Sequence, residues 1–216
     1  MGHTGGLFSF DTREIFTFFF IMLGPIKLLA PFAKLTATSS ESESRSMAIR
    51  ATAIATFTVL LASFIGTVLL AKWNVSAGAL AVGGGIVFFL VALSLVLAPY
   101  TDHPSAQAAA AAPPSTRTLV WQLVSQIVTP YGIAAVILLL TLMPDRLVEI
   151  VTILLAIMLL DLLAMLFARS ILRVAAFGLQ VAGTIMGVLQ VALSVQMIVY
   201  GIRLIAVQSF GMAPPR

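Results

Sequence analysis

Six long apolar segments dominate this 216-residue sequence, and they restrict its possible folds more than any other feature. Hydrophobic residues make up 60% of the chain and charged residues 9%, whereas soluble proteins carry about 25% charged residues. The segments are long enough for helices that cross the hydrocarbon core of a bilayer, which takes about 20 residues. The sequence therefore predicts an all-α, multi-pass membrane protein embedded in the lipid bilayer.

The six predicted transmembrane segments fall into two groups of three. They are expected at residues 14–34, 47–71, 76–98, 118–143, 147–168 and 177–205. Between the groups, residues 99–117 are rich in proline, alanine and small polar residues, which is typical of a flexible linker. A short alanine helix is the alternative there. The predicted organisation is an N-terminal three-helix repeat at 1–98, the linker at 99–117, and a C-terminal three-helix repeat at 118–216.

Proline interrupts the first segment of each group near its middle. The interruptions read Gly24-Pro25-Ile26-Lys27, followed by Pro31, and Thr129-Pro130-Tyr131-Gly132. Proline removes a backbone donor and clashes with the preceding turn, and each break resembles a cap followed by proline at the first helical position. A helix that restarts there presents free N–H groups and the positive end of its dipole. Two interpretations stay open: proline kinks without a ligand, or opposed half-helix N-termini that face a shared anion site.

The two groups also resemble each other in sequence. Leu80, Val82, Gly84, Ile86 and Leu90 match Leu179, Val181, Gly183, Ile185 and Leu189 at a constant offset. Because each group has three segments, the groups would cross the membrane in opposite directions. The pattern predicts a 3+3 inverted repeat with the first helix of each half broken at Gly/Pro, a plan in which paired interrupted segments mark a midplane site.

Two charged residues lie deep inside apolar segments. Lys27 in the first segment and Asp161 in the fifth lie at similar depth, about 20 Å from the same membrane face at 1.5 Å per residue. A charge at mid-span costs roughly 2.5–3.5 kcal/mol on insertion scales, so such residues are functional candidates. The alternatives are a lysine that reaches water from a re-entrant loop, and a carboxylate that packs between helices towards Arg169.

The candidate solute site therefore combines the two breaks with these charges. The candidate substrate-binding residues are Gly24, Pro25, Lys27, Pro31, Gln126, Thr129, Pro130, Tyr131, Gly132 and Asp161. In the sixth segment, Gln180, Gly183, Gly187, Gln190, Ser194 and Gly201 form a stripe of small and polar residues. We interpret this stripe mainly as a helix-packing face, including a close-packing Gly-x-x-x-Gly motif, with Gln190 as a residue that could touch the cavity.

Residue types that carry catalysis or bind metals are scarce. The chain has no cysteine, and its two histidines, His3 and His103, lie outside the apolar segments. No histidine is placed to act as a base for a serine or threonine, and no phosphate-binding loop is present. We therefore expect no enzyme activity, no cofactor and no metal. The formal charge of +4 is spread over loops, which argues against nucleic-acid binding, and a homo-oligomer stays open.

The distribution of basic residues gives a weak topology signal. One side of the predicted membrane holds Lys34, Arg45, Arg50, Arg117, Arg169 and Arg173, and the other holds Arg13, Lys72, Arg146, Arg203 and Arg216. Cytoplasmic loops carry an excess of Lys and Arg. The bias predicts that both termini lie on the outer, periplasmic side.

Three stretches of the sequence together resemble a known family. They are the element from Gly24 to Pro31, the run from Arg50 through Gly66 to Ile86, and the C-terminal run from Ile185 to Arg203. In order and spacing they resemble the MarC family of bacterial integral membrane proteins. The resemblance implies six spans in a bacterial inner membrane and a distant likeness to amino-acid exporters of the LysE type.

The expected function is that of a small secondary transporter or exporter-like permease. Its solute would be small and anionic or zwitterionic, held between the half-helix N-termini with Lys27 nearby. The alternative is a non-transporting membrane scaffold or regulatory protein, in which packing closes both breaks.

Overall fold

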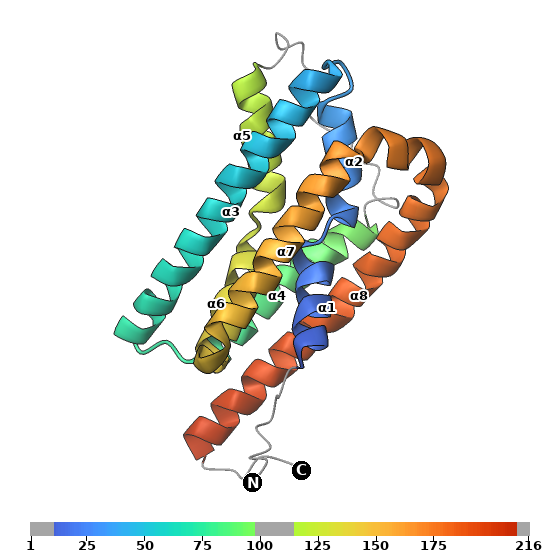
Figure 1. Ribbon diagram of the computed structural model, residues 1–216. Coiled ribbons are helices and arrows are strands. Elements are labelled where there is room, and N and C mark those ends of the chain that lie inside the picture. Colours follow the sequence, from blue (N-terminus) through green and yellow to red (C-terminus); the bar gives the residue numbers. More distant parts are fainter. Residues whose placement is uncertain (1–10, 98–114, 211–216) are drawn as a thin grey trace.

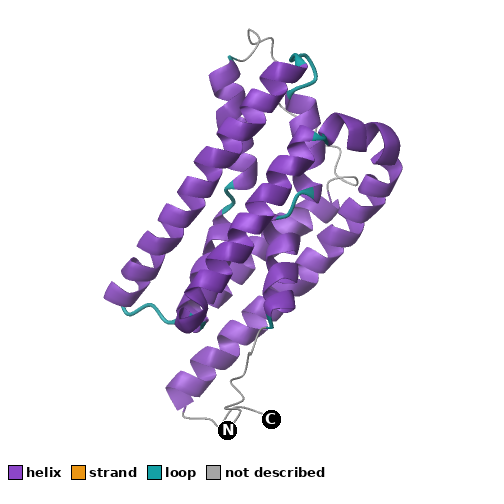
Figure 2. Ribbon diagram, in the orientation of Figure 1, coloured by secondary structure: helices purple, strands orange, loops and turns teal. Residues whose placement is uncertain are grey.

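The computed structural model describes residues 11–97 and 115–210, and every element in these ranges is helical (Figure 2). The elements are α1 (Thr12–Leu23), α2 (Ile26–Leu35), α3 (Glu41–Lys72), α4 (Ala77–Leu97), α5 (Thr116–Ile127), α6 (Pro130–Leu142), η2 (Pro144–Arg146), α7 (Leu147–Leu166) and α8 (Ala168–Phe210). Most of the linker predicted at 99–117 lies outside the described residues. Its last residues are described, and α5 already begins among them at Thr116.

Several of these helices can cross a membrane. By length and apolar composition, five helical stretches of the described residues qualify, and Thr12–Leu35 counts as one of them. The pair α5 and α6 would be a sixth, bent by 47° at its break. These helices confirm the predicted class, an all-helical protein with several membrane-spanning segments.

Helix starts near the membrane surfaces are capped by side chains. Ser40 and Glu43 form a capping box at the start of α3, and Asp11 forms another with Glu14 at α1. Ser115 accepts a hydrogen bond from the Thr118 N–H at the start of α5. At 1.5 Å per residue the 32 residues of α3 span about 48 Å, more than the roughly 30 Å hydrocarbon core. A helix of this length crosses such a core either tilted or with its ends beyond the core.

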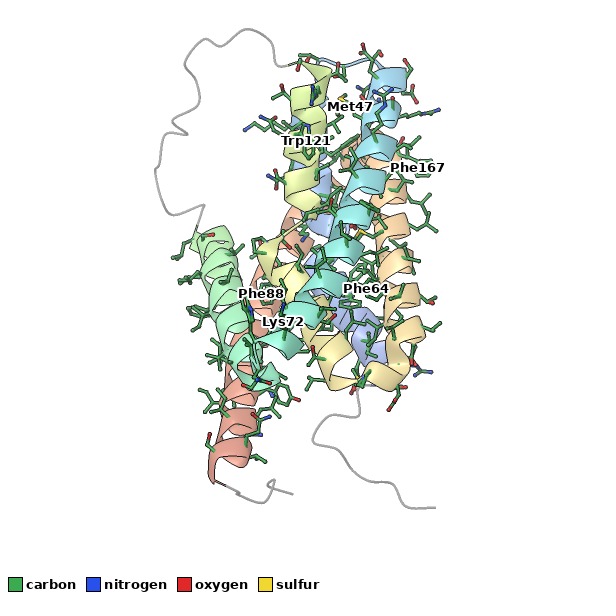
Figure 3. All side chains as sticks on the ribbon, turned by 90° about the vertical axis from the view of Figure 1, so that its left-hand side faces the viewer. Met47, Phe64, Lys72, Phe88, Trp121 and Phe167 are labelled. Atoms are coloured by element: carbon green, nitrogen blue, oxygen red, sulfur yellow. The ribbon has the colours of Figure 1, made fainter. Side chains whose placement is uncertain are left out.

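The helices form one bundle in which α4 lies along α8, while α3 lies beside α5, α6 and α7 (Figures 1 and 3). Both α1 and α2 pack against α7. The buried apolar core draws most on α6 and α7, including Leu139 and Leu154, and then on α3, α5 and α1. By contrast, α3 exposes large apolar side chains such as Phe57, 67% exposed, which is expected of a surface that meets lipid.

Glycines allow α4 and α8 to approach closely. A Cβ atom on Gly201 would lie 2.6 Å from the Gly78 carbonyl oxygen, and one on Gly85 would lie 2.8 Å from Ile198 Cγ1. Small residues at such contacts let helix backbones pack together in a membrane. Only one glycine of the predicted Gly183-x-x-x-Gly187 motif lies at a close helix contact. A Cβ on Gly187 would lie 3.1 Å from Val96 Cγ2, whereas one on Gly183 would meet nothing within 4 Å.

The last helix differs from the predicted segment at 177–205. It begins at Ala168, directly after the turn at Phe167, and continues for 43 residues. No proline or glycine occurs between residues 168 and 177 to end a helix, so the polar stretch around Arg169 and Arg173 stays helical. Figure 1 shows these first turns curving away from α7 before α8 runs back along the bundle.

Candidate functional site

The two interruptions lie next to each other in space. One separates α1 from α2, and the other separates α5 from α6. The Lys27 Nζ atom of α2 lies 3.4 Å from the Tyr131 hydroxyl oxygen of α6. A Cβ atom on Gly132 would lie 2.4 Å from Leu23 Cδ2 at the end of α1. Segments about a hundred residues apart in the chain therefore meet at one point inside the bundle.

Side chains from other helices satisfy the backbone where α1 ends. Because Pro25 has no N–H, the Ile21 carbonyl loses its helical donor. Gln190 of α8 donates from Nε2 to this carbonyl at 2.8 Å, and Lys27 donates from Nζ to the Met22 carbonyl at 2.8 Å. Lys27 thus acts as a cap for α1 in addition to placing its charge at the break.

Gly24 is the residue that the first break requires. Its N–H donates to the Phe20 carbonyl at 2.9 Å, and it ends α1 in an extended conformation. A Cβ atom at this position would lie 2.0 Å from the same Phe20 oxygen. No heavy atoms approach so closely without a bond, so any other residue would displace the end of α1.

Tyr131 holds Lys27 from the second break. The Lys27 ammonium lies 5.3 Å from the centroid of the Tyr131 ring, within the range of a cation–π interaction. The Tyr131 ring also stacks on Phe88 of α4, with centroids 4.8 Å apart and planes tilted by 27°. Both aromatic residues are buried. Residues of α2, α4 and α6 therefore fix the position of the lysine.

Asp161 of α7 is fully buried, and neither of its carboxylate oxygens has a hydrogen-bond partner. Lys27 is the charged residue whose field reaches it, and no hydrogen bond or ion pair joins the two side chains. Asp161 forms no hydrogen bond with Arg169. Arg169 instead donates to the backbone carbonyls of Thr36 and Ser39 in the α2–α3 loop. A buried carboxylate without a partner is costly, which makes Asp161 the most unusual group of the site.

The helices that restart at the breaks have no side-chain caps. Neither α2 nor α6 begins with a side-chain hydrogen bond, in contrast to the capped starts of α1, α3 and α5. Thr129 is the N-cap of α6 and Pro130 its first residue, yet the Thr129 hydroxyl is buried without a partner. The first break differs from the expected cap-and-proline order, because Gly24 caps the end of α1 and Pro25 precedes α2 as its N-cap.

Some predicted site residues lie apart from this cluster. Gln126 is exposed on α5, Pro130 is exposed, and Pro31 lies inside α2 one turn beyond Lys27. Two residues of the cluster were not among the candidates. The polar stripe on the sixth segment had pointed to Gln190, whereas nothing in the sequence distinguishes Phe88 from the other phenylalanines.

Three pockets in the described residues lie away from Lys27. One is an apolar cavity of about 90 Å³ lined by Phe18, Leu139, Met197 and neighbouring residues. The other two lie near the start of α3. None of these three is lined by Lys27, Thr129 or Asp161.

Comparison with known proteins gives a family for this chain. The family model described as MarC family integral membrane protein matches residues 10–206, which is most of the sequence. It confirms the resemblance seen in the three sequence stretches. None of the curated proteins and none of the solved structures compared with the chain matches it.

Proposed function

Because this chain belongs to the MarC family of integral membrane proteins, we propose that it is a small secondary transporter, an exporter-like permease for an anionic or zwitterionic solute. One observation carries the proposal. Two interrupted helices meet around Lys27, and Asp161 lies buried and unpartnered beside them. Interrupted helices of this kind form the midplane solute sites of many secondary transporters.

The charges at the cluster favour a zwitterion over a simple anion. A solute carboxylate would bind to Lys27 and to the uncapped N-terminus of α6, where backbone N–H groups and the helix dipole favour negative charge. Asp161 would accept hydrogen bonds from a solute ammonium group, which would give its carboxylate the partners it lacks. An anion without a positive group would be repelled by Asp161. Amino acids are the simplest solutes with both groups at this spacing.

The packing of the helices supports an inverted repeat, in which α1–α2 correspond to α5–α6, α3 to α7, and α4 to α8. Under this pairing the larger contacts occur in matched sets. The packing of α3 on α5 and α6 corresponds to the packing of α7 on α1 and α2. The packing of α4 on α6 corresponds to the packing of α8 on α2. Smaller contacts such as α1–α8 lack a counterpart of similar extent. The Lys27–Tyr131 contact lies where the two repeats would meet.

Separate hydrogen bonds join α1 and the loop after α2 to other parts of the bundle. Thr12 at the start of α1 donates to Glu149 at the start of α7, which also accepts from Arg146. At the other end, Arg169 donates to the loop that follows α2. If the hydrogen bond at Thr12 breaks while those of Arg169 remain, α1 can move about Gly24. If the bonds of Arg169 break instead, α2 can move. In our proposal, these alternating movements expose the cluster first to one side of the membrane and then to the other.

We further propose a bacterial inner-membrane location with both termini on the periplasmic side. The weak excess of basic residues on the opposite side supports this orientation. Arg50 and Arg117 belong to that opposite side, and both are exposed in the structure.

The test is solute exchange in proteoliposomes. Vesicles with the purified protein, loaded with a mixture of amino acids, organic acids and organophosphates, should release one or a few of them faster than protein-free vesicles. The Lys27→Met variant should abolish that release, whereas Lys34→Met, at an exposed lysine of the same helix, should preserve it. Protein-dependent release that is equally fast with the Lys27→Met variant would refute the proposed site.

The second candidate function is a membrane scaffold or regulatory protein without a solute pathway. Its supporting observation is that Lys27 already donates to the Met22 carbonyl, so the ammonium has a partner within the protein. A scaffold predicts no protein-dependent release of any solute in the mixture, and that outcome would favour it.

A further inference from the structure

A groove lies between the third and fourth turns of α3 and the first two turns of α5. It has a volume of about 720 Å³ and is lined by Arg50, Ala53, Ile54, Thr116, Arg117, Val120 and Trp121. Trp121 is 54% exposed, which is unusual for a tryptophan unless it borders a ligand or the membrane interface. Figure 3 shows Trp121 at the same end of the bundle as Met47, while Lys72 lies towards the other end of α3.

The groove carries positive charge that no described side chain balances. Its lining includes two arginines and no acidic residue. The neighbouring Arg45 is neutralised by Glu41, with 2.6 Å between Nη2 and Oε1. Neither Arg50 nor Arg117 pairs with a carboxylate in the part of the chain that the structure describes. Arginine binds phosphate groups through two parallel donors, so a pair of unpaired arginines favours a phosphate ligand.

An apolar stripe continues from the groove along α3. Arg50, Ile54, Phe57 and Leu61 follow at helical spacing and lie on one face of the helix. Phe57 is 67% and Leu61 47% exposed. At 1.5 Å per residue, Phe57 lies about 10 Å further along the helix axis than Arg50. A ligand with a phosphate at Arg50 and a hydrocarbon chain along this stripe would match both features.

We propose that this groove is a binding site for an anionic phospholipid. The phosphate lies between Arg50 and Arg117, Trp121 packs at the level of the glycerol backbone, and an acyl chain follows the stripe from Ile54 to Leu61. The apolar stripe favours a lipid over free phosphate, which would use only the arginines. The site is separate from the Lys27 cluster and does not depend on solute transport.

Tryptophan fluorescence can test the site, because Trp73 and Trp121 are the two tryptophans of the chain. The Trp73→Phe protein has Trp121 as its one tryptophan and is reconstituted in phosphatidylcholine vesicles. Phosphatidylglycerol or phosphatidylcholine with brominated acyl chains is then added at equal mole fraction. We expect Trp121 to be quenched by brominated phosphatidylglycerol with an apparent association constant at least fivefold higher, since each arginine near an anionic surface contributes about that factor.

The matched variants separate a defined site from general surface charge. The double substitution Arg50→Gln and Arg117→Gln should reduce the preference to about onefold, whereas Arg45→Gln should keep it, because Arg45 is already paired. Equal quenching by the two lipids in the Trp73→Phe protein would overturn the proposal. This comparison does not depend on the folding of any arginine variant. Loss of the preference in Arg45→Gln would also contradict it. Displacement of the lipid by inorganic phosphate at constant ionic strength would assign the site to free phosphate instead.

Discussion

Replacing Lys27 with methionine tests the central cluster most directly, because methionine keeps much of the side-chain volume and removes the ammonium. Lys27 is half-buried and donates to the Met22 carbonyl at 2.8 Å. It also lies over the Tyr131 ring and near Asp161. The variant therefore removes a charged hydrogen bond, a cation–π contact and the nearest cation to a buried carboxylate.

The expected loss of stability follows from these contacts. A hydrogen bond from a charged group contributes about 1.5–3 kcal/mol, and a partly desolvated cation–π contact about 0.5–2 kcal/mol. The free energy of unfolding should therefore fall by about 2–5 kcal/mol in Lys27→Met. Tyr131→Phe is the matched control. It removes only a hydroxyl 3.4 Å from Nζ and keeps the ring, so the loss should be below about 1 kcal/mol.

A double-mutant cycle with Asp161→Leu measures how the two charges interact. Two charges 4 Å apart interact by about 4 kcal/mol at an effective dielectric constant of 20. Since Lys27 and Asp161 are not in contact, we expect a smaller coupling of about 1–3 kcal/mol. The double variant should then lose less stability than the sum of the single losses, because removing both charges leaves neither one stranded.

The assay is unfolding in mixed micelles, by thermal denaturation and by titration with a denaturing detergent, with helicity as the signal. Additivity within about 0.5 kcal/mol would show that Lys27 and Asp161 do not interact. A loss below 1 kcal/mol in Lys27→Met would contradict the capping role of its ammonium at the Met22 carbonyl. Either result would refute the description of this cluster as one coupled unit.

Three further predictions concern other parts of the bundle. Gly24→Ala should lower the melting temperature markedly, because the new Cβ meets backbone, whereas Gly83→Ala, where the Cβ meets nothing within 4 Å, should leave it nearly unchanged in the same thermal scan. Gln190→Leu should reduce stability by about 1–3 kcal/mol in detergent titration, because a buried carbonyl of α1 loses its donor; no measurable change would contradict this cap. Because the chain has no cysteine, single introduced cysteines report its topology. In intact cells, an impermeant maleimide should label Asp145→Cys but not Ser42→Cys. The reverse pattern would overturn the proposed orientation.

The sequence by itself determined the class of the protein and the main helices. Long apolar runs with few charges can satisfy their backbone in lipid only as helices, so composition alone predicted a helical membrane bundle. A capping box joins residues only three positions apart, so the one at Ser40 and Glu43 can be predicted from the sequence alone. The sequence also predicts similar depths for Lys27 and Asp161, since helical rise is the same in every helix.

Only the tertiary structure decided what these residues contact. Whether Lys27 faces water, a neighbouring helix or a ligand depends on how the helices rotate and pack, and one-dimensional spacing does not record this. The structure brought Tyr131 to Lys27 and Phe88 to Tyr131 across three helices, and it brought Gln190 to the carbonyl of Ile21. It also left Asp161 buried without a partner. These contacts join residues about 40 to 170 positions apart, and their energies come from packing that no local pattern specifies.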